Sequence, residues 1–365
     1  MTATGEPREN ASLETILRID GFEELARNKL DPAAYSYYAG GAADEITVRR
    51  NTESFERQVL VPRVLVDVSS IDPSTTLLGT GVSMPVGIAP NAAQGLADPE
   101  GECATARAAS EAGVLMCLST FSSRSMEDVA AASTGPKWFQ LYIHKDRGIA
   151  KDMIERAVAA GYGAIVLTVD LPVGGYRERE LRNPFRSEEQ QAFPNLPVDT
   201  HGKSILELLD GLINASLTWD DLEWVRSIAG VPLILKGVLD PADAARCAAL
   251  GVDAIVVSNH GGRQLDRAPA TIDVLEDIVG AAGDCEVYLD GGVRRGVDVV
   301  TALALGARAV FIGRPYLYAL AAAGQAGVEK CLALMGAEVL NAMALLGAPT
   351  IAGITRDRVR PGPSL

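Results

Sequence analysis

The chain has 365 residues, 48% of them hydrophobic, and a formal net charge of −14. This length suits either two average domains or one large α/β barrel. The acidic charge argues against nucleic acid and anionic membranes as partners, and no stretch approaches the about 20 apolar residues that span a bilayer. Residues 1–10 lack the apolar core of a signal peptide, and the 5 scattered cysteines form no CxxC pair. We therefore expect a cytoplasmic protein with reduced thiols and no metal site.

The N-terminal part of the chain predicts two helices after a loose tail at residues 1–10. Ser12 can cap a helix that runs to about Asn28. Asp31 and Pro32 open a second helix, with Asp as the cap and Pro at the first helical position, and Gly40 ends it. We expect a helical extension over about residues 12–40.

From about residue 85, short apolar runs alternate with alanine-rich helical stretches such as 100–112, 150–160, 241–250, 272–282 and 296–305. Eight mostly apolar runs in this rhythm are typical of buried parallel strands. They predict a (β/α)8 barrel, and a doubly wound sheet is the alternative, although no G-x-G-x-x-G follows the first run. The runs are 86–89, 115–119, 138–143, 164–170, 233–237, 254–260, 287–292 and 309–313.

A long connection after the fourth run, at about residues 171–230, interrupts the rhythm. It is polar and charged around residues 188–191, and it turns amphipathic between Ser204 and Asn214. A long excursion above the carboxyl ends of barrel strands is typical of a lid or a mobile binding loop. We expect one domain over 1–365, with the barrel at about 85–345 and this connection as its lid.

The sixth apolar run leads into Ser-Asn-His-Gly-Gly-Arg-Gln-Leu-Asp at residues 258–266. His260 and Arg263 therefore leave the end of a strand on a tight glycine-rich loop. An imidazole can accept a proton near neutral pH, and a guanidinium can bind a carboxylate through two parallel hydrogen bonds. This pairing suits a small acid whose neighbouring carbon carries a hydroxyl group.

The last two strands are followed by glycines and arginines, at Gly291, Gly292 and Arg294 and at Gly313 and Arg314. Barrels commonly bind phosphate in these loops, through backbone amides and positive charge. Other strand ends carry donors and acceptors suited to a flat heterocycle, with Lys236 able to place positive charge beside its ring. The pattern favours flavin mononucleotide (FMN), and a phosphorylated substrate without a cofactor is the alternative.

At this point the motifs resemble a known family, the FMN-dependent α-hydroxy acid oxidases and dehydrogenases, which include glycolate oxidase, lactate oxidase, mandelate dehydrogenase and 4-hydroxymandelate oxidase. The resemblance runs from about Leu25 to Gly347. It rests on residues 35–42, 138–142, 168–170, 236–237, 258–266, 290–296 and 313–315.

The resemblance implies a role for each matching residue. His260 would be the catalytic base and Asp170 its carboxylate partner, with Tyr142 beside the substrate hydroxyl. Arg177, Arg263 and Tyr37 would hold the substrate carboxylate, and Lys236 would lie near N1 and the C2 oxygen of the flavin. The rest of the FMN site would consist of Pro90, Asn91, Ala92, Ser119, Gln140, Thr168, Ser258, Asp290, Gly291, Gly292, Arg294, Gly313 and Arg314.

Asn91 stands where related enzymes often carry Thr or Ile, which would change a contact to the flavin ring. Two other features bear on the substrate. Phe121 stands where glycolate oxidase has Trp and lactate oxidase has Tyr, so the pocket wall loses a hydrogen-bonding group. The run 173–180 looks more like lactate oxidase than glycolate oxidase. These features favour a mid-sized acid such as lactate or mandelate over glycolate and leave the choice between those two open.

The expected activity is FMN-dependent oxidation of an L-2-hydroxy acid to the 2-oxo acid, with O2 reoxidising the flavin and giving hydrogen peroxide. The alternatives are a dehydrogenase of the same fold that passes electrons to a quinone or another acceptor, and a non-redox FMN barrel enzyme. The charged connection after strand four argues against a membrane-bound form. The resemblance also implies a homotetramer.

Overall fold

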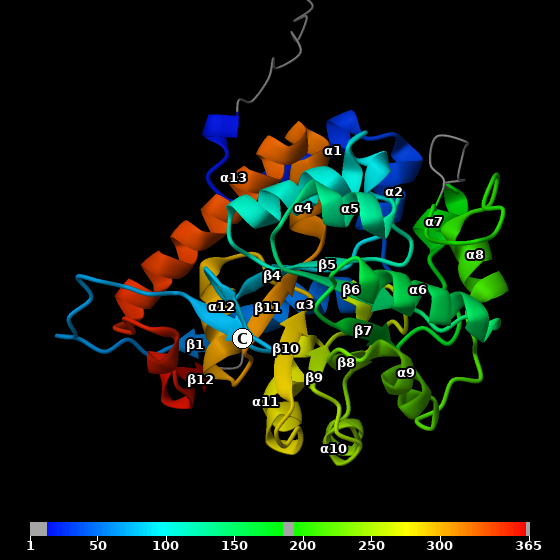
Figure 1. Ribbon diagram of the computed structural model, residues 1–365. Coiled ribbons are helices and arrows are strands. Elements are labelled where there is room, and N and C mark those ends of the chain that lie inside the picture. The colour runs from blue at the N-terminus through cyan, green and yellow to red at the C-terminus, as the bar shows by residue number, and fades with distance from the viewer. Residues whose placement is uncertain (1–12, 185–192, 363–365) are drawn as a thin grey trace, which may run out of the picture.

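The computed structural model describes residues 13–184 and 193–362. Its centre is a closed barrel of eight parallel strands that pair in chain order, with the last strand returning to the first (Figure 1). All eight predicted runs form these strands, so the predicted (β/α)8 architecture is confirmed. The strands are β4 (Val86–Ile88), β5 (Met116–Leu118), β6 (Lys137–Leu141), β7 (Ile165–Thr168), β8 (Leu233–Val238), β9 (Ala254–Val257), β10 (Glu286–Asp290) and β11 (Ala309–Ile312).

Each barrel strand is followed by a helix, and these helices cover the outside of the barrel. The strands are therefore buried on both faces, which explains why their sequences are apolar runs rather than alternating patterns. The helices are α4 (Gly101–Glu111), α5 (Met126–Ala132), α6 (Arg147–Ala159), α9 (Asp221–Ala229), α10 (Pro241–Ala249), α11 (Thr271–Ala281), α12 (Gly296–Ala304) and α13 (Arg314–Leu346).

The barrel interior is filled with side chains rather than open. Trp138, Tyr288 and Phe311 lie in mutual contact, with ring centroids 5.5–5.7 Å apart. A hairpin of β2 (Thr75–Leu77) and β3 (Thr80–Val82) adds the buried Leu77 and Val82 to this cluster. The interior is therefore a packed core, and space for a ligand lies at the carboxyl ends of the strands.

The N-terminal extension differs from its prediction in one respect. A single helix to about Asn28 is wrong for the described residues, where 3-10 turns at Leu13–Thr15 and Ile19–Gly21 precede α1 (Phe22–Lys29). The break lets Ile19 and Phe22 both enter the core, and Gly21 favours it because glycine is a poor helix former. The tail at 1–10 and the cap at Ser12 lie outside the described residues.

The second predicted helix forms as α2 (Pro32–Ala39), and the side chain of Asp31 accepts from the backbone N–H of Ala33, as expected of a cap. After α3 (Ile46–Glu56), β1 (Gln58–Leu60) pairs in antiparallel fashion with β12 (Val359–Pro361). This pairing ties the C-terminal end of the described chain to the segment that follows α3.

The connection after β7 forms helices over part of its described residues. It contains α7 (Glu178–Arg182) and α8 (Ile205–Leu212), and α8 begins with a capping box formed by Ser204 and Glu207. The segment between Ser204 and Asn214, which is amphipathic in sequence, thus forms a helix with Ile205, Leu208 and Leu209 buried. The Asn214 backbone N–H donates to the carbonyl of Ile143, which ties the end of α8 to the loop after β6. The charged run at 188–191 lies outside the described residues.

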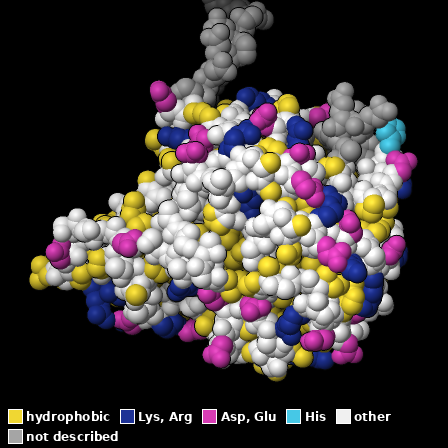
Figure 2. All heavy atoms as spheres, viewed as in Figure 1, with side chains coloured by type: hydrophobic (Ala, Val, Ile, Leu, Met, Phe, Trp, Pro, Cys, Tyr) yellow, Lys and Arg dark blue, Asp and Glu magenta, His cyan; other side chains and the backbone are white. Residues whose placement is uncertain are grey.

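The surface carries charges of both signs. Figure 2 shows acidic and basic side chains interspersed with apolar ones on one face, without a broad patch of either sign. Among the described residues, no helix combines the length and apolar character needed to cross a bilayer, and no His, Cys, Asp and Glu side chains cluster as metal ligands. All 5 cysteines are free thiols.

Candidate active site

A cavity with about 1050 Å³ of empty space, part of it open to solvent, lies at the carboxyl ends of the barrel strands. Of the site residues predicted from the sequence, all line this cavity except Asp170 and Ser258. These two lie directly behind the lining, where Asp170 contacts His260 and Ser258 contacts Lys236. Residues far apart in the chain therefore meet in one site.

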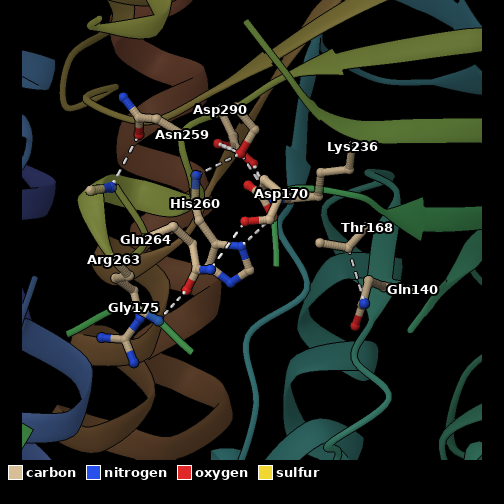
Figure 3. Close-up of polar contacts among 12 residues, drawn as sticks. Gln140, Thr168, Asp170, Gly175, Lys236, Asn259, His260, Arg263, Gln264 and Asp290 are labelled. Carbon is tan, nitrogen blue, oxygen red and sulfur yellow. Dashed lines mark hydrogen bonds and ion pairs between the residues drawn. The ribbon is translucent and has the colours of Figure 1, made fainter. Parts of the chain in front are cut away.

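Two backbone positions with positive φ bring His260 and Asp170 together. His260 adopts a left-handed φ of 57°, which costs about 1–2 kcal/mol for a residue with a side chain, and its Nδ1 lies 2.9 Å from Asp170 Oδ1 (Figure 3). Gly237 in β8 has φ 111°, and a Cβ there would lie 2.5 Å from that of Asp170. Glycine at 237 therefore allows the carboxylate to sit close against β8.

Burial and mutual contact set the protonation of this pair. Burial lowers the pKa of His260, and the neighbouring Asp170 carboxylate offsets this only in part. Burial raises the pKa of Asp170, but the charge of His260 and its hydrogen bond more than compensate, so the pKa of Asp170 lies below its usual value. At neutral pH the site therefore holds a carboxylate and a neutral imidazole, which is able to accept a proton.

Lys236 places a positive charge in the cavity wall. Its Nζ donates to Ser258 Oγ at 2.9 Å and lies 3.2 Å from Asp290 Oδ2, while Ser258 donates to the other oxygen of Asp290 at 2.6 Å. Burial alone would lower the pKa of Lys236, but Asp290 and then Asp170 raise it above its usual value. The ammonium group therefore stays charged and fixed in position.

Arg177 and Arg263 lie side by side although they are far apart in the sequence. The Arg177 Nε donates to the backbone carbonyl of Arg263 at 3.0 Å, and its Nη2 donates to Gln264 Oε1 at 3.1 Å. Arg263 donates to the carbonyls of Tyr37 and Gly40 and lies 4.9 Å from the centroid of the Tyr37 ring. The two guanidinium groups are thus held at the cavity, where a carboxylate can bind.

The wall around the remaining space is apolar and partly formed by the connection after β7. Phe121 packs against Tyr142 and, edge to face, against Phe193, with ring centroids 5.9 and 5.7 Å apart. Leu171 and the α8 residues Ile205 and Leu209 line the same cavity. Sequence reasoning missed these last residues and Phe193. The amphipathic pattern of α8 indicated a buried face but not the surface that it covers.

The loops after β10 and β11 form a cradle for an anion. Gly292 has φ 84°, and a Cβ there would lie 1.9 Å from the Asn51 carbonyl oxygen, so only glycine fits. Burial lowers the pKa of Arg294 and lowers that of Arg314 to about 10. Among the described residues no carboxylate lies within ion-pair distance of either guanidinium. Two partly buried cations without a carboxylate partner fit a phosphate group.

The opposite part of the cavity offers donors and acceptors for a polar ring. Gln140 donates to Thr168 Oγ1 at 3.0 Å and accepts from the Thr120 N–H at 3.1 Å, which fixes its amide at the lining. Asn91 Nδ2 is buried and has no hydrogen-bond partner among the described residues. An orphaned donor in this wall, together with the phosphate cradle and Lys236, fits FMN.

Two other histidines do not belong to the site. His201 is exposed. His144 is fully buried in the loop after β6, and burial lowers its pKa to about 4. The sequence could not show that the connection after β7 covers this position.

The chain is similar in sequence and fold to several known proteins. The FMN-dependent dehydrogenase family matches residues 26–361. L-lactate oxidase from Nostoc sp. is 49% identical over 94% of this chain and 98% of its own, and glycolate oxidase 3 from Oryza sativa subsp. indica is 45% identical over 95% and 97%. The structure of a mandelate oxidase with (S)-4-hydroxymandelic acid superposes with a TM-score of 0.90, at 40% identity over 96% of this chain and all of that one. The chain therefore belongs to the FMN-dependent dehydrogenase family, and FMN is its cofactor.

Proposed function

We propose that the protein is an (S)-2-hydroxy acid oxidase that converts an L-2-hydroxy acid to the 2-oxo acid. The observation that supports this most strongly is one cavity that joins a neutral His260 backed by Asp170 to the paired Arg177 and Arg263. When bound, FMN accepts the two electrons that leave the substrate together with the proton of the Cα–H bond. The names of the similar proteins, lactate, glycolate and mandelate oxidases, support the same reaction class.

The arginines bind and orient the substrate in this proposal. Arg177 and Arg263 hold the carboxylate, and Tyr37 is packed beneath the Arg263 guanidinium. A carboxylate held at two points fixes the direction of Cα, and such positioning contributes a large part of the rate of many enzymes. Tyr142 lies beside the substrate hydroxyl, and burial keeps its phenol protonated by raising its pKa.

His260 and Asp170 handle the hydroxyl proton. Because Nδ1 of His260 is bonded to Asp170, Nε2 is the atom left to accept that proton. The Asp170 carboxylate then stabilises the imidazolium that forms. Loss of the proton from the hydroxyl oxygen and loss of the hydrogen from Cα together leave a carbonyl group. The same residues serve whether the hydrogen leaves as a hydride or through a carbanion.

The remaining residues hold FMN. Arg294, Arg314 and the loop glycines bind its phosphate, Lys236 places positive charge beside the ring, and Asn91, Gln140 and Thr168 meet its polar atoms. The other ring contacts come from Pro90, Ala92, Ser119, Ser258 and Asp290, which line the cavity or lie directly behind it.

The pocket wall favours a mid-sized side chain. Phe121, Leu171 and Leu209 offer no hydrogen-bond donor, so the minimal glycolate gains nothing from them, whereas a methyl or phenyl group buries apolar surface there. We therefore propose lactate or mandelate as the substrate class. Electrons pass to O2, which is reduced to hydrogen peroxide as one substrate molecule loses two electrons. A dehydrogenase that uses a quinone is the alternative.

The quaternary structure and location follow as further proposals. We propose a cytoplasmic, single-domain protein that assembles as a homotetramer. The segment between β1 and β2 extends from the body of the molecule (Figure 1) and exposes Val64 and Leu65, at 82% and 103% relative accessibility. Contact with a second copy would bury these side chains. Light scattering that gives a monomer mass would contradict the tetramer.

Product analysis tests the proposed reaction. Purified protein is mixed with L-lactate, glycolate or (S)-mandelate in air, and O2 uptake, 2-oxo acid and peroxide are measured. The proposal predicts one 2-oxo acid and one peroxide for each O2 consumed. Formation of the 2-oxo acid only when a quinone is added would instead support the dehydrogenase.

A further inference from the structure

Glu180 lies between the two arginines that would bind the substrate. It belongs to α7, one helical turn after Arg177, and its side chain is only 4% exposed. Its Oε2 lies 3.4 Å from Arg177 Nη1 and 3.8 Å from Arg263 Nη2. One buried carboxylate therefore faces both guanidinium groups.

The two arginines need a negative charge nearby to offset their mutual repulsion. The side chains of Arg177 and Arg263 are 3% and 14% exposed, and both point at the same cavity. Two buried like charges repel each other, and an uncompensated buried charge is costly. Within the described parts of the chain, their other hydrogen-bond partners are neutral, namely backbone carbonyls and the side-chain amide of Gln264.

The net charge of Arg177, Arg263 and Glu180 indicates which ligands this part of the cavity can bind. Two guanidinium groups and the Glu180 carboxylate leave one net positive charge, which one substrate carboxylate neutralises. A second carboxylate on the ligand would meet no further unpaired charge here and would face the repulsion of Glu180.

From this geometry we infer that Glu180 is a positioning residue that holds Arg177 and Arg263 together and matches the carboxylate subsite to a monoanionic acid. This inference rests on the proposed function of the same site, because it assigns the arginines to a substrate carboxylate. Glu180 contacts neither the reacting carbon nor the hydroxyl group in this assignment and acts through the two arginines.

The test compares the binding of two ligands that undergo no reaction. Propionate is a monoanion and malonate a dianion of similar size near neutral pH, and the flavin absorbance change on binding gives each Kd. In Glu180→Gln, the ratio of the propionate Kd to the malonate Kd should rise at least about tenfold over wild type, because a nearby negative charge is removed in a site of low dielectric. The kcat/KM for the best 2-hydroxy acid should fall by about tenfold or more, because the arginines lose their shared partner.

Two variants make the result specific. Glu178 lies in the same helix, and its carboxylate pairs with Arg182 at the surface. Glu178→Gln should therefore leave both the Kd ratio and kcat/KM within about twofold of wild type. Glu180→Asp keeps the charge but shortens the side chain, so it should keep the Kd ratio within about threefold while KM rises, since aligned contacts are lost.

Equal Kd ratios in wild type and an FMN-loaded Glu180→Gln would overturn the inference. If Glu180→Gln does not fold, Glu180→Asp tests the inference instead. Values of KM and kcat in Glu180→Asp equal to those of the wild type would contradict the positioning role. These binding measurements require no turnover. A protein that oxidises no 2-hydroxy acid would refute the proposed function while the Kd ratio still reported on Glu180.

Discussion

Nδ1 of His260 lies 2.9 Å from Oδ1 of Asp170, although 90 positions separate the two residues in the chain. The contact joins the end of β7 to the loop after β9. It fixes the orientation of the imidazole, and the buried carboxylate can stabilise the charge that the ring gains on accepting a proton. The first two predictions depend on this contact.

Replacing His260 by Ala should slow flavin reduction by about 10²–10⁴-fold, because general-base catalysis by a positioned side chain contributes that much. FMN should stay bound, since the phosphate cradle is formed by other loops. Anaerobic stopped-flow spectroscopy measures the reduction rate, and the visible spectrum reports flavin content. A rate within tenfold of wild type would remove His260 from the proposed role.

Flavin reduction should depend on pH through the same imidazole. Only neutral His260 can accept the proton, and burial places its pKa below the usual value. The rate should therefore be constant at neutral pH and fall as the pH drops through this lowered pKa, with a midpoint below about 6.5. The measurement is kcat/KM from pH 4 to 9 with a substrate that stays ionised. A rate that rises with acidification would contradict the assignment of His260 as the base.

Arg294→Gln should weaken FMN binding by tenfold or more, on the order expected when a buried charge-assisted hydrogen bond to phosphate is lost. The neighbouring Arg295 pairs with Glu338 at the surface, so Arg295→Gln is the matched control and should bind FMN like the wild type. Fluorescence titration of the apoproteins with FMN gives both Kd values. Equal affinities in the two variants would argue against a phosphate site at Arg294.

Phe121→Tyr tests the apolar wall of the pocket. The wild type should prefer lactate or mandelate to glycolate, because apolar contact contributes about 0.8 kcal/mol for each buried methylene. Tyrosine introduces a hydroxyl group, which should reduce this preference by several-fold. The quantity to compare is kcat/KM for the three acids in both proteins. Glycolate as the best substrate of the wild type would show that Phe121 was misinterpreted.

The barrel could be predicted because each of its strands is a mostly apolar run, which indicates burial on both faces without knowledge of the partner strand. Once the strands were predicted, the polar residues at their carboxyl ends could be assigned to the cavity, because barrel enzymes form their sites there. The start of α1 could not be predicted, because it depends on the burial of Ile19 and Phe22 against the rest of the fold, which the local sequence does not show.

The contribution of the connection after β7 could not be predicted from the sequence. Phe193 packs on Phe121 and Leu209 lines the cavity, yet each reads locally as an ordinary apolar residue. Glu180 reads as one charge among several in a short helix. Its importance depends on Arg263, which lies far along the chain, so only the fold reveals the buried cluster.

Anaerobic titration of the FMN-loaded protein tests the central claim most directly. We predict that L-lactate or (S)-mandelate bleaches the flavin absorbance with one acid molecule per FMN, that one 2-oxo acid forms, and that air restores the colour rapidly. An absorbance that stays unchanged with every 2-hydroxy acid tested, in protein that carries FMN, would contradict the account.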